Sequence, residues 1–349
     1  MLRQFLSGRR ALLPSALFTI LLAATVVTQA DAAAARTYVS GNAFLTLDGT
    51  QCGFIKSVDG GEISANVIEE AAGPTHLVKK HIGQPVYEPF ILQVGFSMTR
   101  AVYEWIKSSW TDLIRKNGSI IYMDYSLNPT SQTNFSNAVI TETTIPACDG
   151  SSKEPAYMTL MLEPEYTVLA TPSPTTKTGE YGKNEQKMWL PSNFRLDIDG
   201  LDCSRVNKID SFTVKRNAIS VEIGNARDYV TQTSELVFPN LRITLAETTA
   251  KSWTDWFNDF VIKGNNDESK EKSGTLTLLS PNRGVELAKI SFSNLGIFRI
   301  GPEKAEANAS QIKRVVAELY CEKMVFEYLG KVVAETQQPP GARVVARRE

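Results

Sequence analysis

The same sequence pattern occurs twice in this chain at a constant spacing, and a duplicated pattern restricts the fold to one built from two similar halves. The run Phe44–Cys52 resembles the run Phe194–Cys203, and each contains an Asp-Gly pair shortly before its cysteine. The two cysteines lie 151 positions apart, and Trp105 and Trp256 share this spacing. One match between alternating segments is weak, but three anchors in one register indicate a repeat.

Each copy is predicted to contain roughly six strands and one helix. Apolar alternation places the strands of the first copy at Ala43–Leu47, Phe54–Val58, Phe90–Met98, Ser119–Leu127, Asn137–Thr143 and Tyr157–Leu169. The strands of the second copy are expected at Phe194–Ile198, Val206–Val214, Asn240–Thr248, Gly274–Ser280, Val285–Phe292 and Ile312–Tyr328. A helix follows the third strand of each copy, at Thr99–Ile114 and Thr249–Ile262.

An antiparallel sheet with one amphipathic helix must bury the apolar face of that helix, and closing the sheet into a barrel removes its exposed edges. We therefore predict a mainly β (α+β) chain of two tandem antiparallel β-barrels, each flanked by one α-helix. Four residues are expected at the seam between helix and barrel: Trp105, Ile106, Trp256 and Phe257. Stacking of a ligand on the tryptophans is the alternative, but their spacing on one helical face favours the seam.

The first 32 residues have the composition of a secretory signal peptide. Three arginines lie within the first ten residues, an apolar run follows at Ala11–Thr28, and Ala30-Asp31-Ala32 fits a cleavage site after Ala32. A membrane anchor is the alternative, but the apolar run is short for a span and contains Pro14. We expect an exported protein, either periplasmic, at the cell surface or extracellular, with no stable membrane span after cleavage. The arginine pair leaves general secretion and twin-arginine export both open.

The remaining domain boundaries follow from composition. Residues 38–170 form the first barrel, residues 171–191 a linker rich in Thr, Pro, Gly and Lys, residues 192–330 the second barrel, and residues 331–349 a disordered tail. Within the first barrel, Gly60–Pro89 is a long connection, matched by Lys215–Phe238 in the second.

Export places the cysteines in an oxidising compartment, where disulfides form. The chain has four of them: Cys52, Cys148, Cys203 and Cys321. Four cysteines allow three connectivities, which the sequence does not separate. The cysteines are therefore predicted to form one or two structural disulfides or to serve as small buried residues.

The sequence contains no recognisable catalytic, cofactor-binding or metal-binding constellation. Its 37 Lys and Arg balance 38 Asp and Glu, a net charge of −1, which argues against nucleic-acid binding. The only two histidines, His76 and His81, lie five apart, unlike a helical metal pair. A hydrolase needs only two opposed carboxylates. The candidate carboxylates are Glu163, Glu165, Asp197, Asp199, Asp202, Asp255 and Asp259.

Each copy resembles the tail tube proteins of contractile phages and their relatives in bacterial injection systems, including the Hcp-like proteins. The resemblance lies in the opening strands, in the passages from strand to helix, and in the run Ala288–Gly296. It covers about Ala43–Leu169 and Phe194–Tyr328. The passages are Phe90–Val94 into Tyr103–Ile106 and Leu241–Leu245 into Trp253–Phe257.

The resemblance implies small barrels that form sixfold rings, with the inner strands in one continuous sheet and the long loop contacting the next ring. A doubled chain implies that three chains form a pseudo-sixfold ring. We therefore predict an exported, non-enzymatic structural protein that assembles with itself, as a trimer or hexamer, and with other tail-like or envelope proteins. The alternatives are a secreted binding or adhesin module that keeps the barrel without assembling, and a secreted hydrolase using a carboxylate pair.

Overall fold

The computed structural model describes residues 41–72, 77–172, 189–222, 229–303 and 313–330. The predicted signal peptide with its cleavage site at Ala32, most of the predicted linker, the predicted tail and His76 lie outside these ranges. Within them, no helix has the length and apolar character needed to cross a membrane.

The first half of the chain folds into an antiparallel sheet with the strand order β2-β1-β7-β8-β10-β6-β3. Its strands are β1 (Asn42–Leu47), β2 (Thr50–Ile55), β3 (Ser57–Gly60), β6 (Phe90–Val94), β7 (Lys116–Met123), β8 (Pro129–Ile145), β10 (Met158–Glu163) and β11 (Tyr166–Ala170), which also pairs with β8. The two ends of this order, β2 and β3, are separated in sequence by Lys56 alone, whose N–H donates to Gln93 O at 2.9 Å. The sheet therefore curls until its two ends meet.

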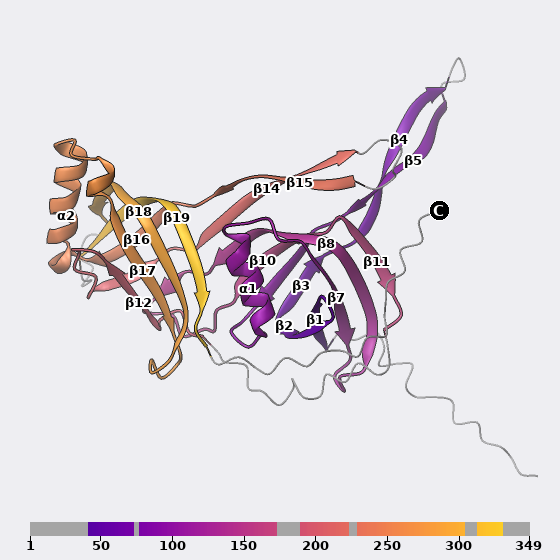
Figure 1. Ribbon diagram of the computed structural model, residues 1–349, viewed down its shortest axis with the longest axis horizontal. Coiled ribbons are helices and arrows are strands. Elements are labelled where there is room, and N and C mark those ends of the chain that lie inside the picture. The colour runs from indigo at the N-terminus through magenta and orange to yellow at the C-terminus, as the bar shows by residue number, and fades with distance from the viewer. Residues whose placement is uncertain (1–40, 73–76, 173–188, 223–228, 304–312, 331–349) are drawn as a thin grey trace, which may run out of the picture. The chain divides into compact units, whose positions relative to one another are not determined.

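The second half repeats this order. Its sheet runs β12-β17-β18-β19-β16-β13-β9, with strands β9 (Cys148–Asp149), β12 (Phe194–Ile198), β13 (Val206–Ile209), β16 (Leu241–Ala246), β17 (Lys272–Leu279), β18 (Glu286–Pro302) and β19 (Arg314–Tyr328). From β12 to β13 the order matches that from β1 to β3, position by position. The described residues contain no counterpart of β2, because 201–205 form turns. The predicted mainly β fold with one helix in each half is confirmed (Figure 1).

Two glycines allow the same close approach in both halves. A Cβ on Gly118 would lie 2.2 Å from the carbonyl oxygen of Thr46, and one on Gly274 would lie 2.9 Å from that of Asp197. Thr46 and Asp197 are 151 positions apart, the spacing of the sequence anchors. Only glycine fits where β7 meets β1 and where β17 meets β12.

An asparagine with positive φ interrupts the long strand of each half. Asn137 in β8 has a φ of 51° and Asn294 in β18 a φ of 56°, and both end the same Phe-Ser-Asn run. Asn137 Nδ2 donates to Glu165 Oε2 at 2.8 Å, and Asn294 Nδ2 donates to Glu322 Oε2 at 2.7 Å. The equivalence of the halves thus continues to their last strands, where the offset becomes 157.

The helix α1 (Arg100–Ser109) ends earlier than the sequence predicts, whereas α2 (Lys251–Phe257) changes to another helical form before the predicted end at Ile262. The indole N–H of Trp105 donates to Ile114 O at 2.9 Å, and that of Trp256 donates to Lys270 O at 3.3 Å. These bonds hold the returning chain against the helix. A π-helical turn, η5 (Asn258–Ile262), continues α2, and two short 3-10 turns, η4 (Glu247–Thr249) and η6 (Glu268–Lys270), flank it.

The two long connections are β-hairpins, which the sequence analysis did not predict. Gly60–Pro89 contains β4 (Ile63–Ala72) and β5 (Leu77–Tyr87), and Lys215–Phe238 contains most of β14 (Phe212–Glu222) and β15 (Tyr229–Val237). The alternation of apolar residues is weak because both faces of β4 and β5 are largely exposed. Both hairpins carry a register shift, after Ala65 and after Arg216, again 151 positions apart.

The end of the predicted linker belongs to the core. Trp189 is buried, its indole N–H donates to Asn193 O at 3.2 Å, and its ring packs edge-on against Phe96. The prediction of a linker to residue 191 is wrong at this end, because the tryptophan near the end of this polar segment is buried in the core.

Replacing Gly118 by alanine is expected to lower the free energy of unfolding by about 1–3 kcal/mol, because the new methyl group would overlap Thr46 O. Chemical denaturation of the purified protein measures this loss. Gly95→Ala is the control, since its Cβ would meet only the Tyr157 ring at 3.7 Å. Equal stability of the two variants would contradict the assigned packing.

Candidate functional site

The two halves exchange strands at their contact. β14, from the second half, pairs with the end of β8 in the first, with Phe212 opposite Ile145 and Lys215 opposite Glu142. In return, β9 from the first half pairs with β13 in the second. Figure 1 shows β14 and β15 extending together from the orange strands of the second half, and the first residues of β14 pair with β8. Each half thus hydrogen-bonds to a strand edge of the other.

Side chains reinforce the pairing of β8 with β14. Lys215 Nζ lies 2.8 Å from Glu142 Oε1, and the hydroxyls of Thr144 and Thr213 are 2.9 Å apart. Val214, opposite Thr143 of β8, is 2 % exposed and belongs to the hydrophobic core.

A charged cluster joins the same hairpin to the first half. The guanidinium of Arg115 donates to Glu165 Oε1 and to the carbonyl oxygen of Thr231 in β15, and Thr231 N–H donates to Glu165 Oε1 at 3.1 Å. Asn137 binds the other oxygen of Glu165. The side chain of Glu165 is 12 % exposed, so the Arg115 cation and two further N–H donors, those of Thr231 and Asn137, compensate for its burial.

An aromatic stack forms the third part of the contact. The ring of Tyr103 in α1 stacks on that of Tyr328 in β19 with a centroid distance of 3.8 Å, and Trp110 packs edge-on against Phe326. Tyr103 O–H donates to Gly95 O at 2.8 Å, and burial raises its pKa well above the usual value. The apolar face of α1 therefore packs against the last strand of the other half.

Among the open strand edges of the described residues, two are equivalent to the edges that pair between the halves. β4 pairs with β5 alone, and the end of β18 beyond Leu295 pairs with β19 alone. By the offsets of 151 and 157, these are the counterparts of β14 and of the end of β8. Inside the chain, β14 pairs with the end of β8. Their counterparts, β4 and the end of β18, have the same kind of edge but do not pair with each other within the described part of the chain.

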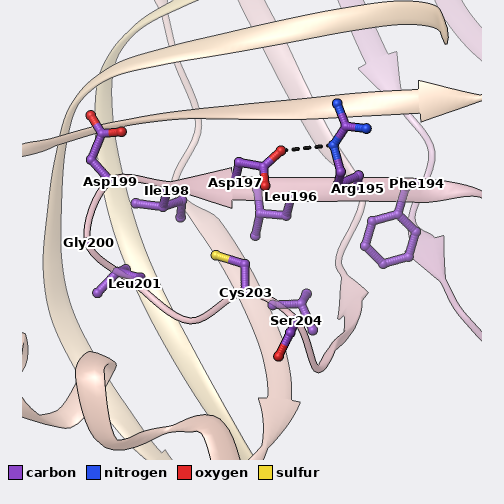
Figure 2. A pocket seen from close by; sticks show the side chains of 11 residues that line it. Phe194, Arg195, Leu196, Asp197, Ile198, Asp199, Gly200, Leu201, Cys203 and Ser204 are labelled. Atoms are coloured by element: carbon purple, nitrogen blue, oxygen red, sulfur yellow. Dashed lines mark hydrogen bonds and ion pairs between the residues drawn. The ribbon is translucent and has the colours of Figure 1, made fainter.

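A groove of about 530 Å³ lies along a third edge, that of β12. It is lined by Phe194–Leu201, Cys203, Ser204 and Val206, and Figure 2 shows the sulfur of Cys203 directed towards β12. In the first half, β2 occupies the equivalent edge of β1. The groove therefore marks the position of the strand that the second half lacks.

The four predicted seam residues lie between helix and sheet to different degrees. Trp105 and Ile106 are fully buried and Trp256 is buried, whereas Phe257 is half-buried at the margin of the core. In the second half, Trp253 is the fully buried tryptophan, with its indole N–H donating to Asp202 O at 3.0 Å. The seam of the first half also contacts the second half.

Three of the four cysteines are free thiols, namely Cys148, Cys203 and Cys321. Cys52 is buried, and its thiol donates to Thr50 O at 3.4 Å. Burial raises the pKa of the Cys148 thiol, and raises that of Cys203 and that of Cys321 to about 11. The structure contains no disulfide among these three, so their role here is that of small buried or half-buried residues.

The candidate carboxylates for a hydrolase take part in structural contacts. Glu165 belongs to the charged cluster, Asp197 pairs with Arg195 at 3.0 Å, and Asp202 accepts bonds from Ser204, whose hydroxyl lowers the pKa of that carboxyl. Asp255 and Asp259 form exposed pairs with Lys251 and Lys263. Asp199 lies in the turn after β12, at the margin of the groove.

The two remaining candidates for chemistry are not part of a cluster either. Glu163 is half-buried, and this burial raises its pKa. His81 is exposed on β5, 3.7 Å from Glu70. No group of metal-ligating side chains occurs among the described residues.

Residues 43–168 match the family model of the T4-like virus tail tube protein gp19. The match covers most of the first half of the chain and none of the second. No curated protein matches the chain.

Several solved structures are similar to this chain. An extracellular contractile injection system, the PVC sheath-tube complex in its extended state, is 14% identical with a TM-score of 0.33, over 38% of this chain and 88% of that one. The anti-feeding prophage (AFP) baseplate is 12% identical with a TM-score of 0.32, over 39% and 93%. Hcp1 from Flavobacterium johnsoniae is 11% identical with a TM-score of 0.25, over 42% and 99%.

The residues at the contact between the two halves were largely missed from sequence. Arg115, Thr231 and Tyr328 belong to no motif, and Glu165 attracts attention only as a candidate acid. The shared Phe-Ser-Asn run was the available signal, because extending the repeat through it pairs Glu165 with Glu322.

Replacing Glu165 by glutamine is expected to lower the free energy of unfolding by about 2–3 kcal/mol, because it leaves Arg115 partly buried without a counter-charge. Urea denaturation measures the loss. Glu163→Gln is the matched control and should change stability by less than about 0.5 kcal/mol, since burial already disfavours the charge there. Similar losses in both variants would contradict the structural role of the cluster.

The raised thiol pKa values predict slow modification of the folded protein. At pH 8, about one thousandth of each thiol at Cys203 and Cys321 is ionised, and the thiolate is the reactive form. Reaction with an aromatic disulfide reagent should be slow when the protein is folded and should reveal at least three thiols in denaturant. Fewer than three after denaturation, with protein purified without reductant, would show that disulfides form.

Proposed function

We propose that this chain is a non-enzymatic structural protein that assembles with copies of itself into rings or tubes. The observation that carries the proposal is the strand exchange, in which β14 of one half completes the edge of a sheet in the other. A chain built in this way has two further strand edges of the same kind, on β4 and on β18, that stay unpaired within the part of the chain that the structure describes. Open strand edges are readily completed by another copy of the chain.

The two halves are tandem copies of one module in this proposal. The support comes from the common strand order, the paired glycines and asparagines, and the hairpins with equivalent register shifts. Three chains then supply six modules to a closed ring, and the match of residues 43–168 to a tail tube family supports stacking of such rings into a tube.

Export completes the proposal. The basic and apolar composition of the first 32 residues supports secretion with cleavage after Ala32, to the periplasm, the cell surface or the medium. Partners there would be other tail-like or envelope proteins. N-terminal sequencing of the exported protein should begin at Ala33.

A secreted binding or adhesin module is the second candidate, and the groove along β12 favours it. A strand edge with an open groove can accept an extended peptide. The hydrolase alternative is not favoured, since most of the candidate carboxylates already pair with neighbouring residues.

Purified protein is expected to form particles whose mass is a multiple of three chains. Light scattering coupled to gel filtration, over a range of protein concentrations, measures this mass, and negative-stain images show whether the particles are rings. A single-chain mass at every concentration would contradict assembly and favour the binding module.

A further inference from the structure

We infer that each chain joins the next by pairing the start of its β4 with the end of β18 of the neighbour, in the register that its own two halves use. This inference rests on the proposed self-assembly and specifies its contact. Inside the chain, Phe212–Lys215 pairs with Glu142–Ile145. Subtracting 151 from the first segment and adding 157 to the second gives Gly61–Ser64 and Arg299–Pro302.

The transferred register places Ile63 of one chain directly opposite Ile300 of the next. Ile63 is the counterpart of Val214, and the two differ in exposure as the inference requires. Ile63 is 46 % exposed, whereas Val214, opposite Thr143 of β8, is 2 % exposed. Ile63 is exposed although its equivalent in the other half is buried. This difference indicates that a neighbouring chain covers Ile63.

Both strands have the free edge that this pairing needs. Over Arg299–Pro302, β18 pairs on one side only, with Glu318–Val315 of β19. The equivalent part of β8 pairs on both sides, with β10 and with β14. β4 pairs with β5 alone, while its counterpart β14 pairs with both β15 and β8. Addition of one chain to the next satisfies both edges at once.

The charges at the outer contact also match. At the internal contact, the hairpin supplies Thr231 and the sheet supplies Arg115 with Glu165. At the outer contact, the counterpart on the hairpin is Lys80, at the offset of 151. On the sheet, the counterparts are Glu271, at the offset of 156 that Gly118 and Gly274 share, and Glu322, at the offset of 157. The sheet supplies the cation, Arg115, at the internal contact, and the hairpin supplies it, Lys80, at the outer contact. In both contacts the cation lies opposite or beside an acidic side chain, so the charges are complementary.

Glu271 shows that the sheet side of this contact is incomplete. Its Oε1 accepts a hydrogen bond from the hydroxyl of Tyr320 at 2.6 Å, but its buried Oε2 has no hydrogen-bond partner among the described residues. A buried carboxylate oxygen without a donor is costly. Lys80 of the next chain is the donor that the transferred register supplies, and in the single chain it is 63 % exposed beside Glu69.

Site-directed cross-linking tests the register. A variant with Ile63→Cys and Ile300→Cys, treated with a bifunctional thiol reagent that spans about 5 Å, should link chain to chain, because directly opposed side chains lie about 5 Å apart. Denaturing gels should show products of two and three chains, about tenfold above those of the unmodified sequence. Thr144→Cys with Thr213→Cys is the internal control and should cross-link without an increase in mass.

An out-of-register pair, Ile63→Cys with Val285→Cys, controls for random collision, since Val285 is as exposed as Ile63 but precedes β18. Equal interchain products from this pair and from the Ile63/Ile300 pair would overturn the inference. Assemblies seen by light scattering without any Ile63/Ile300 product would overturn the register and leave the proposed function intact. A single-chain mass throughout would overturn both.

Charge reversal tests the electrostatic part. Lys80→Glu and Glu322→Lys should each weaken assembly about tenfold, and the double variant should restore it, because an exchanged ion pair keeps its attraction. Lys79→Glu introduces the same charge on the opposite face of β5 and should leave assembly within about twofold. Thermal denaturation of each variant checks that the fold is intact. Failure of the double variant to exceed the single ones would contradict the pairing.

Discussion

The main-chain hydrogen-bonding groups at the edges of strands govern the architecture of this chain. An unpaired edge exposes a row of donors and acceptors that another strand can bind. In the first half, the consecutive strands β2 and β3 pair with β1 and with β6, the two sides of the curled sheet, and a strand from the second half pairs with the edge of β8. Three of the remaining open edges, on β4, β18 and β12, are where assembly or binding takes place in our proposals.

Burial follows from the same constraint. Because β14 lies against β8, the side chains between them are excluded from water, and Glu165 is buried with a full set of donors. The aromatic stack of Tyr103 on Tyr328 extends this contact to α1 and β19. The two halves consequently share one hydrophobic core rather than two.

The sequence predicted those elements whose local pattern agrees with their environment. Phe194–Ile198 was placed at its observed bounds, because alternation over a half-buried strand is unambiguous. The hairpins were missed because Val67 and Ile82 are exposed, so apolar residues there do not mark a buried face. Arg115 and Thr231 were missed for another reason, since 116 positions separate them and only the tertiary fold brings them together.

The differences between the halves matter as much as their likeness. If both contacts used the same residues, a hairpin could dock on either half, and chains would add in mixed order. Arg115 beside Glu165 in one half, and Glu271 beside Glu322 in the other, give the two docking surfaces different charges, while Thr231 and Lys80 are their counterparts on the hairpins. On the wrong surface, Lys80 would lie near Arg115 and be repelled, whereas Thr231 would leave Glu271 and Glu322 without a cation. Such unfavourable contacts give specificity between similar interfaces. Duplication followed by this divergence gives alternating modules in a fixed order, which one module repeated without change would not do.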